Sequence, residues 1–242
     1  MFLRVIPPIR ARGKIQMAID LWLLNQLNQQ IDQGLTPNPV LRFYTWEKPT
    51  ISLGYHQKSY PDHWAGIDSV DIVRRPTGGR AVLHGGDLTY AVIMPSSGKT
   101  HRDSYCDICR FLVEGWRSLG RELTFGAVGR GYIHNPSCFG TATAADLITT
   151  EGEKFIGSAQ LHRGHGILQH GSMLLKVNQA LFTEIFATPA PNPPKVLIDQ
   201  EIIITTLTQA AANCFGLKIL SQPLSAGEST EVESLANQSL LR

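Results

Sequence analysis

The chain has 242 residues, 43% of them hydrophobic and 17% charged, with a formal net charge of +2, which is typical of an ordinary soluble globular protein with one substantial core. The mild charge, spread along the chain, argues against nucleic acid as a partner, and no run approaches the roughly 18 apolar residues of a membrane span. The first residues lack a signal-peptide pattern and four cysteines are too few for a disulfide scaffold, so we expect a cytoplasmic protein with reduced thiols and no membrane partner.

Helical and extended patterns follow each other in chain order. Residues 14–32 carry apolar side chains at helical spacing, which predicts an amphipathic helix that packs on a sheet and ends near Gly34. Runs rich in β-branched and aromatic residues then predict five strands with hardly a helix between them, at 40–46, 50–54, 71–76, 80–84 and 88–95.

The second half continues with a helix, more strands and a final helix. We expect helices at 105–120 and 200–216, with strands between them at 146–150, 154–160 and 166–175. Strands grouped in runs, with helices at either end, favour an α+β fold with a mixed or antiparallel sheet packed with helices. We expect one domain over residues 1–220 and a C-terminal tail over 221–242, as a short helix or a frayed end.

The stretch RRPTGGRAVLHGGDLTY, residues 74–90, holds groups that a folding core does not need. The paired glycines Gly78 and Gly79 allow positive φ and let another group approach the main chain closely. Their bare N–H groups, beside Arg74 and Arg75, suit a carbonyl, carboxylate or phosphate oxygen. The alternative is a glycine-rich hairpin with surface arginines.

Alternation along two strands brings polar side chains together. His84 shares a face with Arg80, so an imidazole and a cation point the same way. Along residues 154–160, alternation predicts one face with Lys154, Ile156, Ser158 and Gln160, and the other with Phe155, Gly157 and Ala159. A row led by a lysine can line a pocket, although a lysine at a sheet edge also serves against aggregation.

Three segments in this order, RRPTGGRAVLH, EKFIGSAQ and GILQHGS, resemble the biotin/lipoate A/B protein ligase superfamily, and the resemblance runs from about Arg4 to Phe186. It implies an α+β catalytic domain in which the Arg-Gly-Gly turn and the lysine strand enclose an acyl tunnel, with Lys154 on the acyl carbonyl. We expect no cofactor and no metal. The substrate-binding residues that it implies are Arg74, Arg75, Gly78, Gly79, His84, Gly157, Ser158, Ala159, His170 and Gly171.

The segment HNPSCFGTATAADL resembles the Cys-Phe segment that carries the nucleophile in the cysteine-dependent lipoate-forming octanoyltransferases. The resemblance implies acyl transfer through a thioester on Cys138, which suits the task because the thioester still reacts with an amine. A free thiol has a pKa of about 8.5, so a cation such as Lys154 would raise its thiolate fraction. The alternatives are a buried structural thiol at Cys138 and, for His134, either a base or part of a polar turn.

Two departures from that class leave the substrate preference open. Gly85 and Gly86 follow His84 where those transferases usually carry an acidic or amide residue, and no acidic residue follows Cys-Phe directly. The short stretch after MLLKV favours a transferase over an ATP-dependent ligase, which usually carries an extra C-terminal domain.

The expected function is therefore octanoyl transfer, with octanoyl-acyl carrier protein as donor and a lysine of a lipoyl domain or of the glycine cleavage H protein as acceptor. Three alternatives stay open: an ATP-dependent lipoate or biotin protein ligase, an amidotransferase that moves the acyl group between carrier proteins, and a non-catalytic acyl-binding relative.

The remaining cysteines and histidines point to packing rather than to metal. Cys106 and Cys109 form half of a zinc pattern on an expected helix, and Cys214 lies on an apolar helix. A metal is not expected either at the three histidines with loop-like spacing, His162, His165 and His170.

Overall fold

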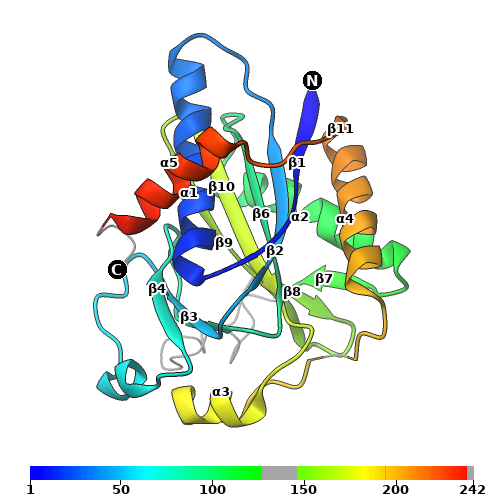
Figure 1. Cartoon of the computed structure of the whole chain (residues 1–242). Coiled ribbons are helices and arrows are strands. Elements are labelled where there is room, and N and C mark those ends of the chain that lie inside the picture. Colours follow the sequence, from blue (N-terminus) through cyan, green and yellow to red (C-terminus); the bar gives the residue numbers. More distant parts are fainter. Residues whose placement is uncertain (127–145, 194, 239–242) are drawn as a thin grey trace.

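The computed structural model describes residues 1–126, 146–193 and 195–238. Its centre is an eight-stranded sheet with the strand order β11-β1-β2-β6-β10-β9-β8-β7 (Figure 1). β1 pairs in parallel with β11 and β2, and the other neighbouring pairs are antiparallel. The strands are β1 (Phe2–Ala11), β2 (Val40–Trp46), β6 (Leu88–Pro95), β7 (Leu123–Phe125), β8 (Asp146–Thr149), β9 (Lys154–Arg163), β10 (Gly166–Met173) and β11 (Lys218–Ser221).

Helices cover both faces of this sheet (Figure 1). On the first, which we call the α1 face, lie α1 (Gly13–Asp32) and α5 (Ala226–Asn237). On the second, the α2 face, lie α2 (His101–Ser118) and α4 (Gln200–Phe215). The arrangement confirms the α+β class with a mixed sheet that the sequence predicts.

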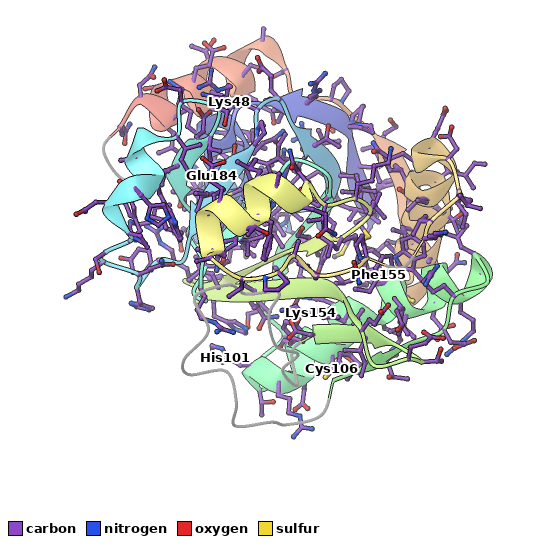
Figure 2. The ribbon with its side chains drawn as sticks, turned by 90° about the horizontal axis from the view of Figure 1, so that it is seen from below. Lys48, His101, Cys106, Lys154, Phe155 and Glu184 are labelled. Carbon is purple, nitrogen blue, oxygen red and sulfur yellow. The ribbon has the colours of Figure 1, made fainter. Side chains whose placement is uncertain are left out.

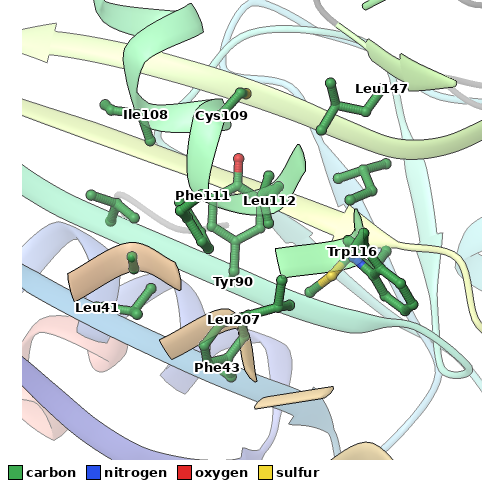
Figure 3. Packing of buried hydrophobic residues seen from close by; sticks show 14 of the residues in the cluster. Leu41, Phe43, Tyr90, Ile108, Cys109, Phe111, Leu112, Trp116, Leu147 and Leu207 are labelled. Atoms are coloured by element: carbon green, nitrogen blue, oxygen red, sulfur yellow. The ribbon is translucent and has the colours of Figure 1, made fainter. Parts of the chain in front are cut away.

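The α2 face is closed by interlocking apolar side chains (Figure 3). The Trp116 and Phe155 rings meet edge to face with centroids 4.8 Å apart, and Tyr90 meets Phe111 at 5.6 Å. Leu207 of α4 packs so closely on α2 that a Cβ at Gly115 would lie 2.5 Å from its Cδ2. The core of this face is therefore tightly packed around Gly115 and Trp116.

A second, three-stranded sheet with the order β4-β3-β5 lies beside the α1 face. Its strands are β3 (Thr50–Leu53), β4 (Asp71–Arg74) and β5 (Val82–His84). It packs against a short 3-10 helix, η1 (Asp62–Gly66), and α3 (Gln179–Phe186), with Trp64 and Phe186 edge to face at 5.6 Å. The arginine-glycine stretch lies between β4 and β5, so this small sheet places it next to the large sheet.

Strand β1 has no counterpart among the elements that the sequence patterns predict. β1 contains Pro7 and Pro8, and its pairing with β2 shifts register between Ile6 and Ile9, which is where a strand tolerates proline. The segment 221–242 includes α5, which begins at a capping box formed by Ser225 and Glu228. Within the described ranges, no helix combines the length and apolar character needed to cross a membrane.

Candidate active site

An apolar cavity lies between the α1 face of the large sheet and the small sheet. Strands β2, β6, β10 and β9 contribute lining residues from the large sheet, β3 and β5 from the small one, and Met17 comes from α1. Every predicted substrate-binding residue except Arg74 lines it. The structure thus brings together the two stretches that lie far apart in the sequence.

Arg75 holds the glycine turn in place from within. Its side chain is buried and donates to the backbone carbonyls of Gly78 and Arg80, at 2.7 and 2.8 Å from Nη2. Nη1 donates to the carbonyl of Ser52 at 2.7 Å and to its hydroxyl at 3.2 Å. Gly79 has φ +98°, and a Cβ there would lie 2.6 Å from Nη2. The turn therefore needs both the arginine beneath it and a glycine at this position.

Arg74, by contrast, points away from the cavity. Its Nη1 donates to the carbonyls of Gly54 and Gln57, at 3.1 and 2.5 Å. It lines a separate hollow with Lys14 and Tyr60. Its contacts tie the loop after β3 to β4, and none of them reaches the cavity.

His84 stands in a chain of three hydrogen-bonded side chains. Its Nε2 lies 2.8 Å from the Ser52 hydroxyl, and its Nδ1 lies 2.7 Å from the Asp87 carboxylate. The ring stacks on Trp46 with centroids 4.0 Å apart. Asp87 was not predicted as a site residue, and it reaches back to His84 because Gly85, at φ +144°, turns the chain between them.

Burial alone would raise the pKa of Asp87, but its neighbours outweigh that cost. The charge and hydrogen bond of His84, with hydrogen bonds from Ser172 and the Gly85 N–H, lower this pKa to about 2. Thr89 also donates to the same carboxylate, at 3.0 Å. The site therefore keeps a buried carboxylate ionised beneath the imidazole.

His170 lies in a second buried network. Its Nδ1 is 2.8 Å from the Asp20 carboxylate of α1, and its Nε2 is 2.7 Å from the Thr77 hydroxyl. Arg42, fully buried, pairs with Asp20 at 2.9 Å, and Tyr44 donates its hydroxyl to Asp20 at 3.1 Å. Burial, and after it the Asp20 charge, raises the pKa of Tyr44, so this hydroxyl stays a donor. The network ties the glycine turn, at Thr77, to α1 and β2.

Lys154 lies on the opposite face of β9 from the one that simple alternation predicts. In the pairing of β8 with β9, Ile148 faces Lys154 and Leu147 faces Ile156, so Phe155 is an extra residue, a β-bulge. The bulge turns Lys154 to the α1 face with Gly157, while Phe155 and Ile156 both enter the α2-face core. Figure 2 shows Lys154 and Phe155 next to each other on β9. The predicted row of Lys154 with Ile156 and Ser158 is therefore wrong.

The Lys154 ammonium is buried beside the cavity. Its Nζ pairs with Asp146 at 2.9 Å, and a Cβ at Gly157, a lining residue, would lie 3.2 Å from Nζ. Because Gly157 has no side chain, the ammonium has room at this edge. Asp146 also accepts a hydrogen bond from the Gly126 N–H through its backbone carbonyl, at 2.9 Å. Gly126 and Asp146, the described residues on either side of 127–145 in the sequence, are thus hydrogen-bonded to each other next to Lys154.

The predicted nucleophile Cys138 and the candidate base His134 lie outside the described residues. Of the other thiols, Cys109 is buried in the α2 face, where burial raises its pKa to about 12. Burial also raises the pKa of Cys214. In the described ranges, no group of three or more His, Cys, Asp and Glu side chains is arranged to hold a metal ion.

The sequence patterns did not reveal the partners that hold the site together, which are Asp20, Arg42, Ser52, Asp87 and Asp146. A signal was present for two of them. Asp20 and Arg42 are charged residues within runs expected to be buried, and a buried charge requires a partner.

Comparison with known proteins agrees with this geometry. Residues 13–203 match the family model of the lipoyl protein ligase A/B catalytic domain. The octanoyltransferase LipM of Carboxydothermus hydrogenoformans is 39% identical over 177 residues, 69% of this chain and 62% of that protein. The octanoyltransferase LipM of Halalkalibacterium halodurans is 32% identical over 254 residues, 92% of this chain and 90% of that protein.

A solved structure shows the same fold at lower identity. Protein Ta0514 of T. acidophilum, solved with bound lipoic acid, superposes with a TM-score of 0.80 at 18% identity, covering 97% of this chain and 95% of that one. The family model covers most of the length of the sequence. The chain therefore belongs to the lipoyl protein ligase A/B catalytic domain family.

Proposed function

We propose that this protein is an octanoyltransferase of lipoate biosynthesis, which takes an octanoyl group from acyl carrier protein and attaches it to a lysine of a lipoyl domain or of the glycine cleavage H protein. The observation that carries the proposal is the apolar cavity with a buried ammonium at one edge, formed by Lys154 over Gly157. The names of the relatives, octanoyltransferase in both, support the same activity.

The chemistry is a double transfer through Cys138. Its thiolate attacks the carbonyl of the donor thioester, the carrier thiolate leaves, and an octanoyl thioester forms on the enzyme. The acceptor lysine amine then attacks this thioester, an amide forms, the amine loses its proton, and the Cys138 thiolate is released. Each step passes through a tetrahedral oxyanion, and a cation aimed at that oxygen commonly contributes about 3 kcal/mol. We assign this role to Lys154.

The surroundings of Lys154 suit that assignment. The ammonium is buried and held at 2.9 Å by Asp146, so its position is set before substrate arrives. Gly126 and Asp146, which flank in the sequence the segment that carries Cys138, are hydrogen-bonded to each other, and Asp146 contacts the ammonium. A charge in a water-poor site stabilises a developing oxyanion far more than one in solvent.

Intact-protein mass spectrometry tests the mechanism. The protein is mixed with octanoyl-acyl carrier protein without acceptor, ATP or free acid, and we expect a mass increase of one octanoyl group that neutral hydroxylamine removes. Cys138→Ser should lose the hydroxylamine-labile species. Cys109→Ser is the matched control, because burial raises the pKa of Cys109 to about 12 and leaves it unreactive at neutral pH.

The alternatives predict different results. An ATP-dependent ligase would release pyrophosphate from ATP and free octanoic acid, and Cys138→Ala would remain active. An amidotransferase would ignore octanoyl-acyl carrier protein and accept an octanoylated carrier domain. A binding protein would hold the acyl carrier without turnover. An adduct on Cys109, or full activity of Cys138→Ala, would overturn the Cys138 mechanism.

A further inference from the structure

The floor of the cavity is a row of residues that crosses four strands. Strand register places Gly157 of β9 beside Ser172 of β10, Ser172 beside Thr89 of β6, and Thr89 beside Tyr44 of β2. All of them line the cavity. Because neighbouring strands lie about 4.8 Å apart, the row is about 14 Å long.

The two ends of this row differ in the size of their side chains. At the β9 end lie Gly157 and Ala159, with the Lys154 ammonium beside Gly157. The glycine turn lies over the same end, because Thr77 is bonded to His170, which pairs with Ala159. The end with small residues and the ammonium is therefore the one that receives the reacting carbonyl of the proposed substrate.

At the β2 end the cavity is bounded by large side chains. Tyr44 and Trp46 stand with ring centroids 5.7 Å apart, and Met17 of α1 lies beside them with 2% of its surface exposed. An apolar chain that enters past Gly157 must end against these three residues.

The two rings are fixed by polar contacts, whereas Met17 is not. Tyr44 donates to Asp20, and Trp46 donates to the Thr89 hydroxyl at 2.9 Å. Shortening either would leave a buried polar group without its donor. Met17 presents only an unbranched thioether, so its size can change without the loss of a hydrogen-bond donor.

The length of an octanoyl group fits this row. Ordinary bond lengths and angles give an extended eight-carbon chain a length of about 9 Å, and a hydrogen bond from the ammonium to its carbonyl adds about 3 Å. The methyl end then falls about 12 Å along the row, between β6 and β2. We propose that Met17 is the end stop of the cavity and sets the acyl chain length, an inference that rests on the proposed function.

Substitution of Met17 tests this directly. Met17→Ala removes three heavy atoms and should move the preferred donor from octanoyl to decanoyl. Each buried methylene changes an affinity about fourfold, so two should raise the ratio of decanoyl to octanoyl kcat/KM by about tenfold or more. Met17→Phe should shift the preference toward hexanoyl. The substrates are acyl carrier proteins loaded with six, eight, ten and twelve carbons.

Leu24→Ala is the matched control. Leu24 lies on the same helix and is fully buried in the same core as Met17, yet it does not line the cavity. It should lose a similar amount of thermal stability and keep the wild-type order of donors. An unchanged order in Met17→Ala, or the same shift in Leu24→Ala, would overturn the proposal.

A second measurement separates this proposal from the proposed function. Calorimetric titration with free hexanoate, octanoate, decanoate and dodecanoate reports the cavity without any transfer. A wild type that transfers no acyl group from any donor would contradict the function. A Met17→Ala protein that is folded by circular dichroism and binds the four acids in the wild-type order would contradict the end stop alone.

Discussion

The two faces of the large sheet are closed in different ways. The α2 face is packed with aromatic and aliphatic side chains, and its buried polar groups are neutral, such as Tyr90 and Gln169. The α1 face near the small sheet holds buried charged groups, the Asp87 carboxylate beside His84 and Asp20 with Arg42, around an open cavity. Side chains held by directed polar bonds cannot collapse into a neighbouring space as apolar ones do, so the charged face keeps room for a ligand.

The largest effect on folding should come from the α2 face. Leu207→Ala should lower the free energy of unfolding by about 2–5 kcal/mol, because it leaves a cavity between α4 and α2. Urea unfolding measures the loss, and Ile202→Ala, at an exposed position of the same helix, is the control. The folded protein should keep its wild-type kcat. A parallel loss of kcat in Leu207→Ala would show that the two faces are not separate in function.

The largest effect on turnover should come from the ammonium on the α1 face. Lys154→Gln keeps a donor toward Asp146 and removes the charge, so kcat should fall about a hundredfold or more. Asp146→Asn retains the ammonium and should lose less. Steady-state octanoyl transfer measures both. Near-normal kcat in folded Lys154→Gln would contradict the role of this charge.

The buried Asp87 carboxylate of the α1 face should also make stability depend on acid. The pKa of Asp87 is about 2 in the fold, against 3.8 for an unperturbed aspartate side chain, so its contribution is present above about pH 4 and is lost as the pH falls toward 2. The difference corresponds to about 2 kcal/mol. Asp87→Asn should remove this part of the acid-induced loss, measured by urea unfolding between pH 2 and 6, and Asp68→Asn, at an exposed residue, should not. If the free energy of unfolding changed with pH in the same way in wild type and Asp87→Asn, this contribution of Asp87 would be refuted.

The smallest expected effect compares two adjacent glycines of the turn. Gly79→Ala should cost about 1–2 kcal/mol, because φ is +98° and the new Cβ would meet Arg75 Nη2. At Gly78 a Cβ meets no described atom within 4 Å, so Gly78→Ala should leave the stability unchanged. Thermal unfolding of both variants measures the difference in stability between them. Equal stabilities would mean that Arg75 does not hold the turn as the structure indicates.

Regular elements were the predictable part of this molecule. β2 and β6 occupy the residues that their aromatic and β-branched runs predict, and α4 follows its apolar periodicity. β1 was not predicted because its proline pair interrupts the pattern. β11 was not predicted because its four residues are all exposed at the sheet edge. Local patterns thus indicate strands well where both faces are buried.

The site was predictable only in part, since its geometry depends on contacts between distant segments. The glycine turn and His84 followed from their own sequence, but the partner of His170 is Asp20, 150 residues away. The bulge at Phe155 is set by pairing with β8, so alternation within β9 placed Lys154 on the wrong face. Arg74 and Arg75 are adjacent and look alike, yet only Arg75 lines the cavity.

The bulge at Phe155 makes the position of the ammonium depend on how β9 pairs with β8. If residues 154–157 paired in strict alternation, every catalytic side chain would still be in the protein, yet Lys154 would share a face with Ile156 and point into the apolar core of the α2 face. Deletion of Phe155 would remove the bulge and leave Lys154 opposite Ile148 on the α1 face, but the core of the α2 face would lose the ring that packs on Trp116. One extra residue thus lets the same strand supply two successive apolar side chains to the core on one face and an ammonium to the cavity on the other.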